Sequence, residues 1–288
     1  MPGLKEIRKR INSVKSTKQI TKAMKMVSAA KFRKAQARIS ELKPYAEKME
    51  AVLQSLAGSV GSGHPLLEVR PVKQVEVLTL TGDRGLCGAF NTNVMKAALK
   101  TIKDLESQGY AVSVSSIGKK GFDLFKRREI SLRKSWVGLS GKITYATAQE
   151  IARELSQAFI DGVFDELILV YNEFKSAVVQ RVKTSQLLPM APIKGEDRSP
   201  ETVDVIFEPN QQAIFDSLVP KNVEIQIYRA LLDSQAAEEA ARMTAMENAT
   251  KAANDMIARL TLKYNKARQE SITKELMDIV GGVEALKQ

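Results

Sequence analysis

Residues 221–280 of this chain read KNVEIQIYRALLDSQAAEEAARMTAMENATKAANDMIARLTLKYNKARQESITKELMDIV, sixty residues without a glycine or a proline. Alanine, glutamate, methionine, lysine, glutamine and arginine dominate the stretch, and all of them favour helix. At about 1.5 Å per residue, a helix of this length would reach roughly 90 Å, whereas a compact domain is roughly 30 Å across. We therefore expect a rod that extends beyond any globular body.

Such a helix is stable in water only when its apolar stripe is covered. The stripe consists of residues three or four positions apart: Met246, Ala249, Ala253, Ile257, Leu260, Tyr264 and Ala267. This spacing predicts a left-handed coiled coil. Residues 4–43 also lack glycine and proline, and a similar stripe there runs through Leu4, Ile7, Ile11 and Val14. We expect its phase to slip at Lys18 and to resume as Ile20, Met24 and Val27.

The two ends of the chain are expected to form one long antiparallel two-helix coiled coil. A parallel homodimer is the alternative, but the ends differ in charge and each is the other's evident apolar partner. We assign residues 1–57 to the N-terminal coiled-coil helix and residues 210–288 to the longer C-terminal one. The last turns of the longer helix should stay unpaired and present an apolar tip to a partner protein, formed by Ile272, Leu276, Ile279, Val280 and Val283.

Residues 72–209 alternate strand and helix patterns and predict a central Rossmann-like α/β domain with a mostly parallel sheet. The expected strands are 72–81, 110–117, 130–137, 167–174 and 177–186, and the expected helices are 90–107, 122–127 and 143–161. Residues 203–207 are a candidate edge strand. The fold class is thus α/β, with a long coiled coil attached.

The net charge of +11 is concentrated at one end of the chain. Residues 1–40 hold twelve lysines and arginines against one acid, Glu6, so the remaining residues sum to zero. A basic, acid-poor N-terminus also resembles a mitochondrial transit peptide, but this one continues without a break into the helical pattern. One helix, rather than the whole surface, therefore has a special electrostatic role.

A glycine-rich turn follows the first expected strand, where such sheets often bind ligands. Its residues, Gly82-Asp83-Arg84-Gly85-Leu86-Cys87-Gly88, have the spacing G-x-x-G-x-x-G rather than the dinucleotide fingerprint G-x-G-x-x-G. A phosphate-binding loop of the G-x-x-x-x-G-K-[ST] type is missing from the sequence. We therefore interpret the turn as one that packs a helix tightly on its strand, and expect no cofactor.

Residues equipped for catalysis are scarce. His64 is the only histidine, and alone it could neither build a metal site nor complete a catalytic triad. Cys87 is the only cysteine, which excludes an internal disulfide, and no second histidine is present to activate it. The adjacent carboxylates Glu238-Glu239 and Asp165-Glu166 should point apart and form no acid/base dyad. No apolar run approaches the length of a transmembrane helix. We expect no catalytic residue, no metal site and no membrane span.

Three stretches resemble the gamma subunit of F-type ATP synthase: KQITKAMKMV at 18–27, TGDRGLCG at 81–88 and YNKARQESIT at 264–273. The resemblance implies a non-catalytic rotor, present in one copy, that couples a membrane ion-translocating ring to catalytic beta subunits. It implies three alpha and three beta subunits, an epsilon subunit and the c-ring as partners. Chloroplast members carry a regulatory cysteine pair that this chain cannot form. A bacterial type, peripheral at the cytoplasmic face of the cell membrane, is therefore expected.

The resemblance also implies contacts between rotor and stator. Met24 would lie opposite an acidic loop of a beta subunit, with Arg242, Gln269 and Thr273 contributing from the C-terminal helix. Met24 has a second interpretation as a residue of the coiled-coil seam. We further hypothesise that the basic segment faces acidic beta-subunit loops through Lys18, Lys22 and Lys25.

Two other functions compete with this one. A nucleic-acid-binding coiled coil would use the basic helix, but Phe32 is the only aromatic residue in 1–40 to stack on bases. A small α/β enzyme with helical appendages is opposed by the missing phosphate loop.

Overall fold

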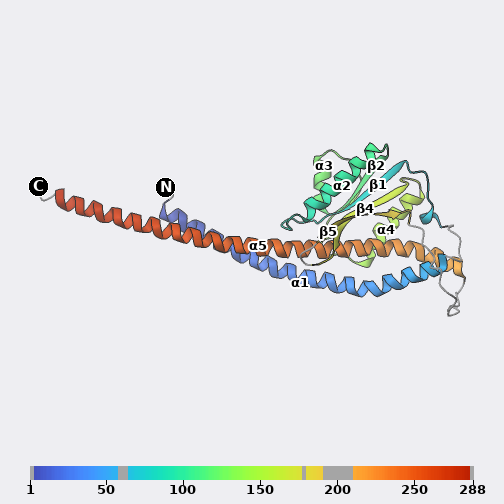
Figure 1. Cartoon of the computed structure of the whole chain (residues 1–288), viewed down its shortest axis with the longest axis horizontal. Coiled ribbons are helices and arrows are strands. Elements are labelled where there is room, and N and C mark those ends of the chain that lie inside the picture. The colour runs from blue at the N-terminus through green and yellow to red at the C-terminus, as the bar shows by residue number, and fades with distance from the viewer. Residues whose placement is uncertain (1–2, 58–63, 177–179, 191–209, 286–288) are drawn as a thin grey trace. The chain divides into compact units, whose positions relative to one another are not determined.

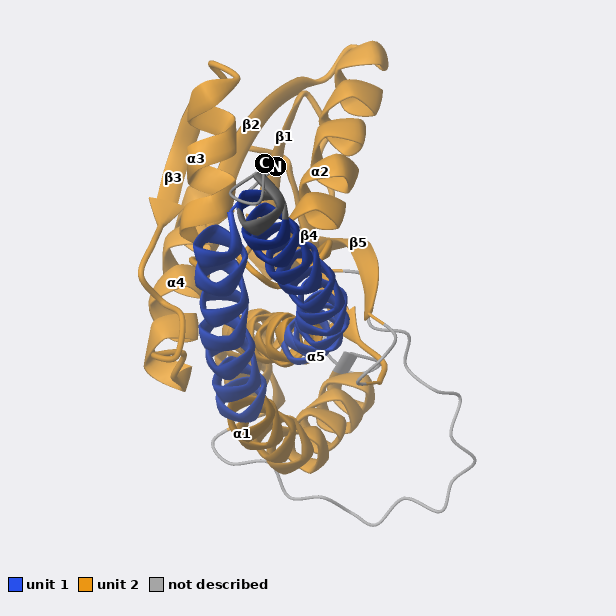
Figure 2. Ribbon diagram, turned by 90° about the vertical axis from the view of Figure 1, so that its left-hand side faces the viewer, with its two compact units in different colours: residues 1–28, 243–288 blue, residues 29–242 orange. Residues whose placement is uncertain are grey.

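The computed structural model describes residues 3–57, 64–176, 180–190 and 210–285. The chain divides into two compact units (Figure 2), residues 1–28 with 243–288 and residues 29–242. We call them the helical unit and the sheet unit. Helix α1 (Leu4–Ala57) and helix α5 (Gln211–Ala285) each run without interruption from one unit into the other. The two long helices of the predicted fold are therefore present, and α5 is the longer, with 75 residues against 54.

The sheet of the sheet unit has the strand order β3-β2-β1-β4-β5, and Figure 2 labels all five strands, whereas Figure 1 labels all but β3. Its strands are β1 (Gln74–Leu80), β2 (Ala111–Ile117), β3 (Leu132–Trp136), β4 (Glu166–Phe174) and β5 (Gln180–Leu188). The first four are parallel and β5 is antiparallel to β4. The predicted mostly parallel sheet is confirmed; residues 177–179 and 203–207 lie outside the described residues.

Helices cover both faces of this sheet, which is why β1 is buried along almost its whole length. On one face, α2 (Phe90–Ser107) and α3 (Lys119–Arg127) pack on β1, β2 and β4 around Val77, Val114 and Phe125. On the other face, α4 (Tyr145–Ile160) and the long helices share one core with the sheet. A short 3₁₀ helix, η1 (Pro65–Leu67), precedes β1.

Among the described residues, no helix combines the length and the apolar composition needed to cross a bilayer.

Candidate functional site

The helical unit is an antiparallel helix pair. The hydroxyls of Thr21 and Thr250 lie 2.8 Å apart, and Lys25 Nζ lies 3.2 Å from Glu247 Oε1. Residue numbers thus fall along α5 as they rise along α1, which fixes the opposite direction of the two helices. The predicted antiparallel packing of the chain ends is confirmed.

The seam of α5 has the predicted spacing. Met246 and Ala253 are buried, and the other five predicted positions are half-buried. Met256 and Leu262, which fall outside the pattern, are 52% and 71% exposed. The 3.5-residue repeat therefore identifies the side of α5 that packs on α1.

The predicted phase slip in α1 is wrong. Its stripe continues in register through Lys18, Thr21 and Ser28, of which the last two are buried. Ile20 and Val27, expected in the seam, are 60% and 55% exposed. Small hydroxyl side chains fill this part of the seam, and the Thr21–Thr250 hydrogen bond takes the place of an apolar contact. Apolarity alone therefore pointed to the wrong side of the helix.

This correction reveals two exposed strips of α1 on either side of its seam, Ile20 with Val27 and Lys22 with Met26, which we together call the outer face of α1. All four side chains are exposed. Apolar side chains among cations suit a protein partner that offers both apolar and acidic groups.

The other predicted contacts of α1 lie nearer the seam. Met24, Lys18 and Lys25 are half-buried, and Lys25 is already paired with Glu247. The position of Met24 is thus consistent both with a residue of the coiled-coil seam and with a residue that contacts a partner.

The end of α5 is unpaired within the described residues. The register of the pair brings Leu4, at the start of α1, level with about residue 267. Among the residues of α5 whose burial is described, Ser271 is the last that is half-buried. Beyond it, Leu276 is 58% exposed and Ile279 is 65% exposed. Ile272 and Val280 are exposed as well, whereas the side chain of Val283 lies outside the described residues.

Gln269 and Thr273 share one exposed side of α5. Together with Lys266, Glu270 and Met277 they form one exposed strip along the helix. Their spacing of three and four residues places them in a row along the helix. The structure thus brings these two predicted contact residues together on the same surface.

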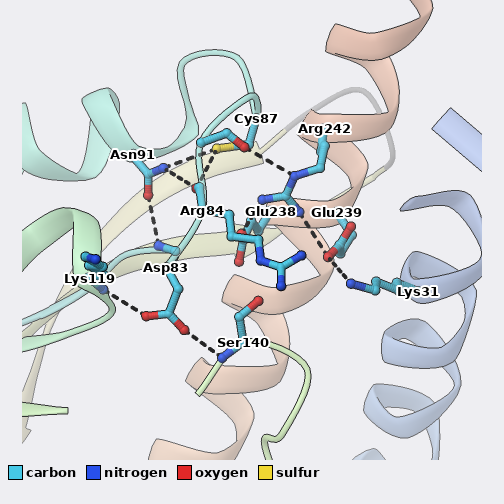
Figure 3. A network of polar contacts seen from close by, with 12 residues as sticks. Lys31, Asp83, Arg84, Cys87, Asn91, Lys119, Ser140, Glu238, Glu239 and Arg242 are labelled. Carbon is cyan, nitrogen blue, oxygen red and sulfur yellow. Dashed lines mark hydrogen bonds and ion pairs between the residues drawn. The ribbon is translucent and has the colours of Figure 1, made fainter. Parts of the chain in front are cut away.

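In the sheet unit, the glycine-rich turn at 82–88 is held by its own aspartate (Figure 3). Asp83 accepts hydrogen bonds from the backbone N–H groups of Lys119 at 2.9 Å, Gly138 at 3.0 Å and Ser140 at 2.8 Å. Converging backbone N–H groups are the usual means of binding a phosphate. Here the chain's own carboxylate occupies them, so the turn anchors neighbouring loops.

Glycine at position 82 allows α5 to approach this turn. A Cβ atom there would lie 2.6 Å from Glu238 Oε1, so any other residue would require the Glu238 carboxylate to shift. The N–H of Gly82 donates to Asn91 Oδ1 at 2.8 Å, and Asn91 Nδ2 donates to Arg84 O at 3.3 Å. The glycine at position 82 therefore lies against α5.

Arg242 is the centre of a group of polar contacts that we call the Arg242 cluster (Lys31, Gly85, Glu238, Glu239 and Arg242), and Figure 3 labels all of its members except Gly85. Arg242, Glu238 and Glu239 are buried, whereas the side chain of Lys31 is 47% exposed. Arg242 is 7% exposed, and its guanidinium pairs with Glu238 and lies 3.0 Å from Glu239 Oε1. Its Nε donates to Gly85 O at 3.4 Å, and Lys31 Nζ lies 3.8 Å from Glu239. The cluster therefore ties α1, α5 and the turn after β1 together.

Burial dominates the electrostatics of this cluster. It raises the pKa of Glu238, while Arg242 opposes that shift. Burial also lowers the pKa of Arg242, but the carboxylates of Glu238 and Glu239 more than reverse this, so the pKa is raised overall. Arg242 therefore stays charged, and its guanidinium binds groups of the same chain.

Glu238 and Glu239 were missed as a functional pair by the sequence interpretation. The prediction that these two side chains point apart is wrong, because both contact Arg242, which lies four residues after Glu238 and three after Glu239 on the same helix. The pattern E-E-x-x-R at 238–242 is the signal that would have found them.

The remaining candidates have structural roles. Cys87 is buried, which raises the pKa of its thiol, and Asn91 Nδ2 donates to its sulfur at 3.2 Å. His64 Nδ1 accepts from Leu66 N at 3.1 Å and caps η1. Within the described ranges, no three His, Cys, Asp or Glu side chains are grouped to hold a metal ion.

The whole chain matches known proteins. The ATP synthase family model matches residues 3–286. ATP synthase gamma chains of Chlorobium luteolum, Pelotomaculum thermopropionicum and Trichlorobacter lovleyi are 47%, 46% and 43% identical over all of this chain and all of theirs. This chain belongs to the ATP synthase gamma family.

Solved structures agree with membership of the gamma family. A chain in the central stalk and c-ring structure of Tetrahymena thermophila mitochondrial ATP synthase is 28% identical, with a TM-score of 0.58, covering 80% of this chain and 99% of that one. A chain in the Euglena gracilis mitochondrial ATP synthase rotor shares the fold, with a TM-score of 0.68 at 20% identity over 93% of this chain and 98% of that one. The implied role, a non-catalytic rotor subunit of the central stalk, is confirmed.

Proposed function

We propose that the helix pair turns as a shaft inside a ring of three alpha and three beta subunits, while the sheet unit attaches it to the c-ring and the epsilon subunit. One copy of the chain would serve each complex, peripheral at the cytoplasmic face of a bacterial cell membrane. The observation that supports this most is the antiparallel helix pair whose longer member ends in exposed Leu276, Ile279 and Val280. Apolar side chains at the end of a helix need a socket in a partner.

The helix pair has the mechanical properties that a shaft needs. Residues 4–43 and 221–280 contain no glycine and no proline, the residues at which helices most often kink. Continuous seam packing joins the two helices, so that twisting one must turn the other. Unequal length and one-sided charge make the pair asymmetric, as a rotor must be to present a different side to each beta subunit.

The outer face of α1 would meet the stator. Exposed ion pairs contribute roughly 0–1 kcal/mol each and tolerate changes of register, so cations such as Lys22 suit a surface that slides past acidic loops. Ile20 and Val27 add apolar contact area that the seam does not use. Lys18, Met24 and Lys25 would complete the surface from its seam side.

On α5, Gln269 and Thr273 are exposed and would contact the stator directly. Arg242 is buried in its cluster, so we propose that it acts by holding α5 to the turn at 82–88. Torque applied to the helices would then reach the sheet unit through buried ionic contacts.

Rotation of a reconstituted complex tests this function. The chain is assembled with alpha and beta subunits fixed to a surface, and a bead attached to the sheet unit is followed during ATP hydrolysis. We expect stepwise rotation in one direction, weakened when Lys18, Lys22 and Lys25 are all replaced by glutamate. ATP hydrolysis by the assembled complex without bead rotation would refute the proposal.

A further inference from the structure

An exposed apolar surface lies at the end of the sheet unit where two of its parallel strands begin. Residues 68–73 lead into β1, and residues 159–165 connect the last turn of α4 to β4. Val69, on the first segment, is 75% exposed, and Ile160 and Val163, on the second, are 42% and 41% exposed. We call these three side chains the Val69 surface. Large apolar side chains that gather outside the core mark a site where a partner binds.

Direct contacts fix the two segments against each other. Arg70 Nη2 donates a hydrogen bond to Phe159 O at 3.1 Å, and the guanidinium lies 4.6 Å from the centre of the Phe159 ring. Asp165 Oδ2 accepts hydrogen bonds from the backbone N–H groups of Lys73 at 2.8 Å and Gln74 at 3.0 Å. A surface held in this way loses little conformational entropy when it binds, which favours tight association.

The charge around the Val69 surface is negative. Residues 68–73 and 159–166 contain four acids and two cations: Glu68, Asp161, Asp165 and Glu166, and Arg70 and Lys73. Helix α4 also ends here with no basic residue in its last turn, and the C-terminus of a helix carries a negative partial charge. An apolar surface among acids fits a partner that offers apolar and basic side chains.

The position of this surface within the sheet unit indicates what the partner is. The 3₁₀ helix η1, which comes directly before residue 68, lies beside the start of α5, because His64 at its N-cap interacts electrostatically with Asp216. The turn that follows the C-terminal end of β1 meets α5 at Arg242 instead. Along the helix, residues 216 and 242 are roughly 39 Å apart. A force that enters the sheet unit at the Arg242 cluster would therefore have to leave it near the Val69 surface.

We propose that the Val69 surface is where the sheet unit grips the c-ring, and that the loops of the ring present apolar and basic side chains to it. This inference rests on the proposed function, in which torque passes from the helices to the ring. Apolar contact suits a joint that must not slip, because it depends on close packing in one register, whereas the exposed cations of α1 suit a surface that slides. The epsilon subunit does not have to carry this torque, and the experiment below separates it from the ring.

Retention of the c-ring by the assembled complex tests the proposal. The chain is assembled with alpha, beta and epsilon subunits, a tag on the beta subunits captures the complex in mild detergent, and bound c-ring is measured at increasing ring concentration. Val69→Lys/Val163→Lys should weaken c-ring binding at least about tenfold, because it replaces apolar contacts by charges of the same sign as those of the partner. ATP-driven proton pumping by reconstituted vesicles should fall with it, while ATP hydrolysis continues.

Leu86→Lys/Val137→Lys is the matched control. These two side chains are 64% and 51% exposed and follow the C-terminal ends of β1 and β3, so the same change in charge falls at the opposite end of the sheet. We expect the control to bind the c-ring within about twofold of the original chain. Val69→Ser/Val163→Ser removes apolar surface without adding charge and serves if the lysine variant does not fold; it should weaken binding at least about threefold.

Equal c-ring binding by the original chain, the lysine variant and the serine variant would overturn the inference, and so would loss of the epsilon subunit with the c-ring retained. Bead rotation by the complex without the c-ring separates this inference from the proposed function. The lysine variant should rotate as the original chain does, because the Val69 surface lies outside the helix pair. Failure of the original chain to rotate would refute the proposed function, whereas normal rotation with unchanged c-ring binding would refute this inference alone.

Discussion

Replacing Arg242 by methionine should destabilise the sheet unit strongly. The substitution removes contacts to Glu238, Glu239 and Gly85 O and leaves two carboxylates that are 8% and 5% exposed. Lys31 cannot compensate, because it lies 3.8 Å from Glu239 and is itself 47% exposed. Breaking a buried ion pair from one side typically costs about 3–5 kcal/mol, and we expect a loss in that range at pH 8.

The pH dependence identifies the cause of that loss. Burial raises the pKa of Glu238 above its unfolded value, and Arg242 opposes the shift. Without Arg242 the pKa of Glu238 in the folded state rises further. Above that pKa the buried carboxylate is ionised and lowers the free energy of unfolding, and this loss disappears as the pH falls through the pKa and the group becomes neutral. The destabilisation by Arg242→Met should therefore be smaller at pH 5 than at pH 8.

Urea unfolding followed by the fluorescence of Trp136, the only tryptophan, reports on the sheet unit. Arg259→Met is the matched control, since Arg259 is exposed on α5 and its loss should change the free energy of unfolding by less than about 0.5 kcal/mol. The double variant Glu238→Gln/Arg242→Met should recover part of the stability. A loss below about 1 kcal/mol for Arg242→Met at pH 8 would refute the reasoning.

Three further predictions concern single side chains. Ile20→Asp should change the free energy of unfolding by less than about 0.5 kcal/mol, because Ile20 is 60% exposed, and it should nevertheless slow ATP-driven rotation. Ile7→Asp, at a position that is 2% exposed, should unfold the helix pair, as measured by circular dichroism. Leu86→Gly should stabilise the chain by about 0.5 kcal/mol in urea titrations, because Leu86 is 64% exposed and its φ of 61° is left-handed backbone that favours glycine. A loss of stability above about 1 kcal/mol would show instead that the Leu86 side chain packs against the protein. Burial raises the pKa of Asp233 to about 6, so its ionised form opposes folding above that pH. Asp233→Asn should therefore stabilise the chain at pH 8 by up to about 3 kcal/mol and not at pH 4; equal effects at both pH values would contradict this.

Much of the fold was predictable because its signals are local. Sixty residues without glycine or proline gave the long helix, and the 3.5-residue spacing from Met246 to Ala267 gave its buried side. The parallel sheet followed from alternating strand and helix patterns. Each of these signals lies within one segment of the chain.

The parts that could not be predicted depend on contacts between distant segments. The seam at Thr21 is polar because its partner Thr250, from the other end of the chain, completes the hydrogen bond. The Arg242 cluster requires Gly85, 157 residues away in the sequence. Asp83 likewise meets its three N–H donors only after α3 and the loop that follows β3 have folded.

The central claim is that the two helices turn together as one body, and a reversible cross-link across their seam tests it most directly. Thr21→Cys and Thr250→Cys, in a Cys87→Ala background, would place two thiols where the hydroxyls now lie 2.8 Å apart. The oxidised complex should rotate during ATP hydrolysis at the rate of the reduced one. Rotation that stops on oxidation and returns on reduction would show that α1 and α5 must move against each other, and would contradict the account.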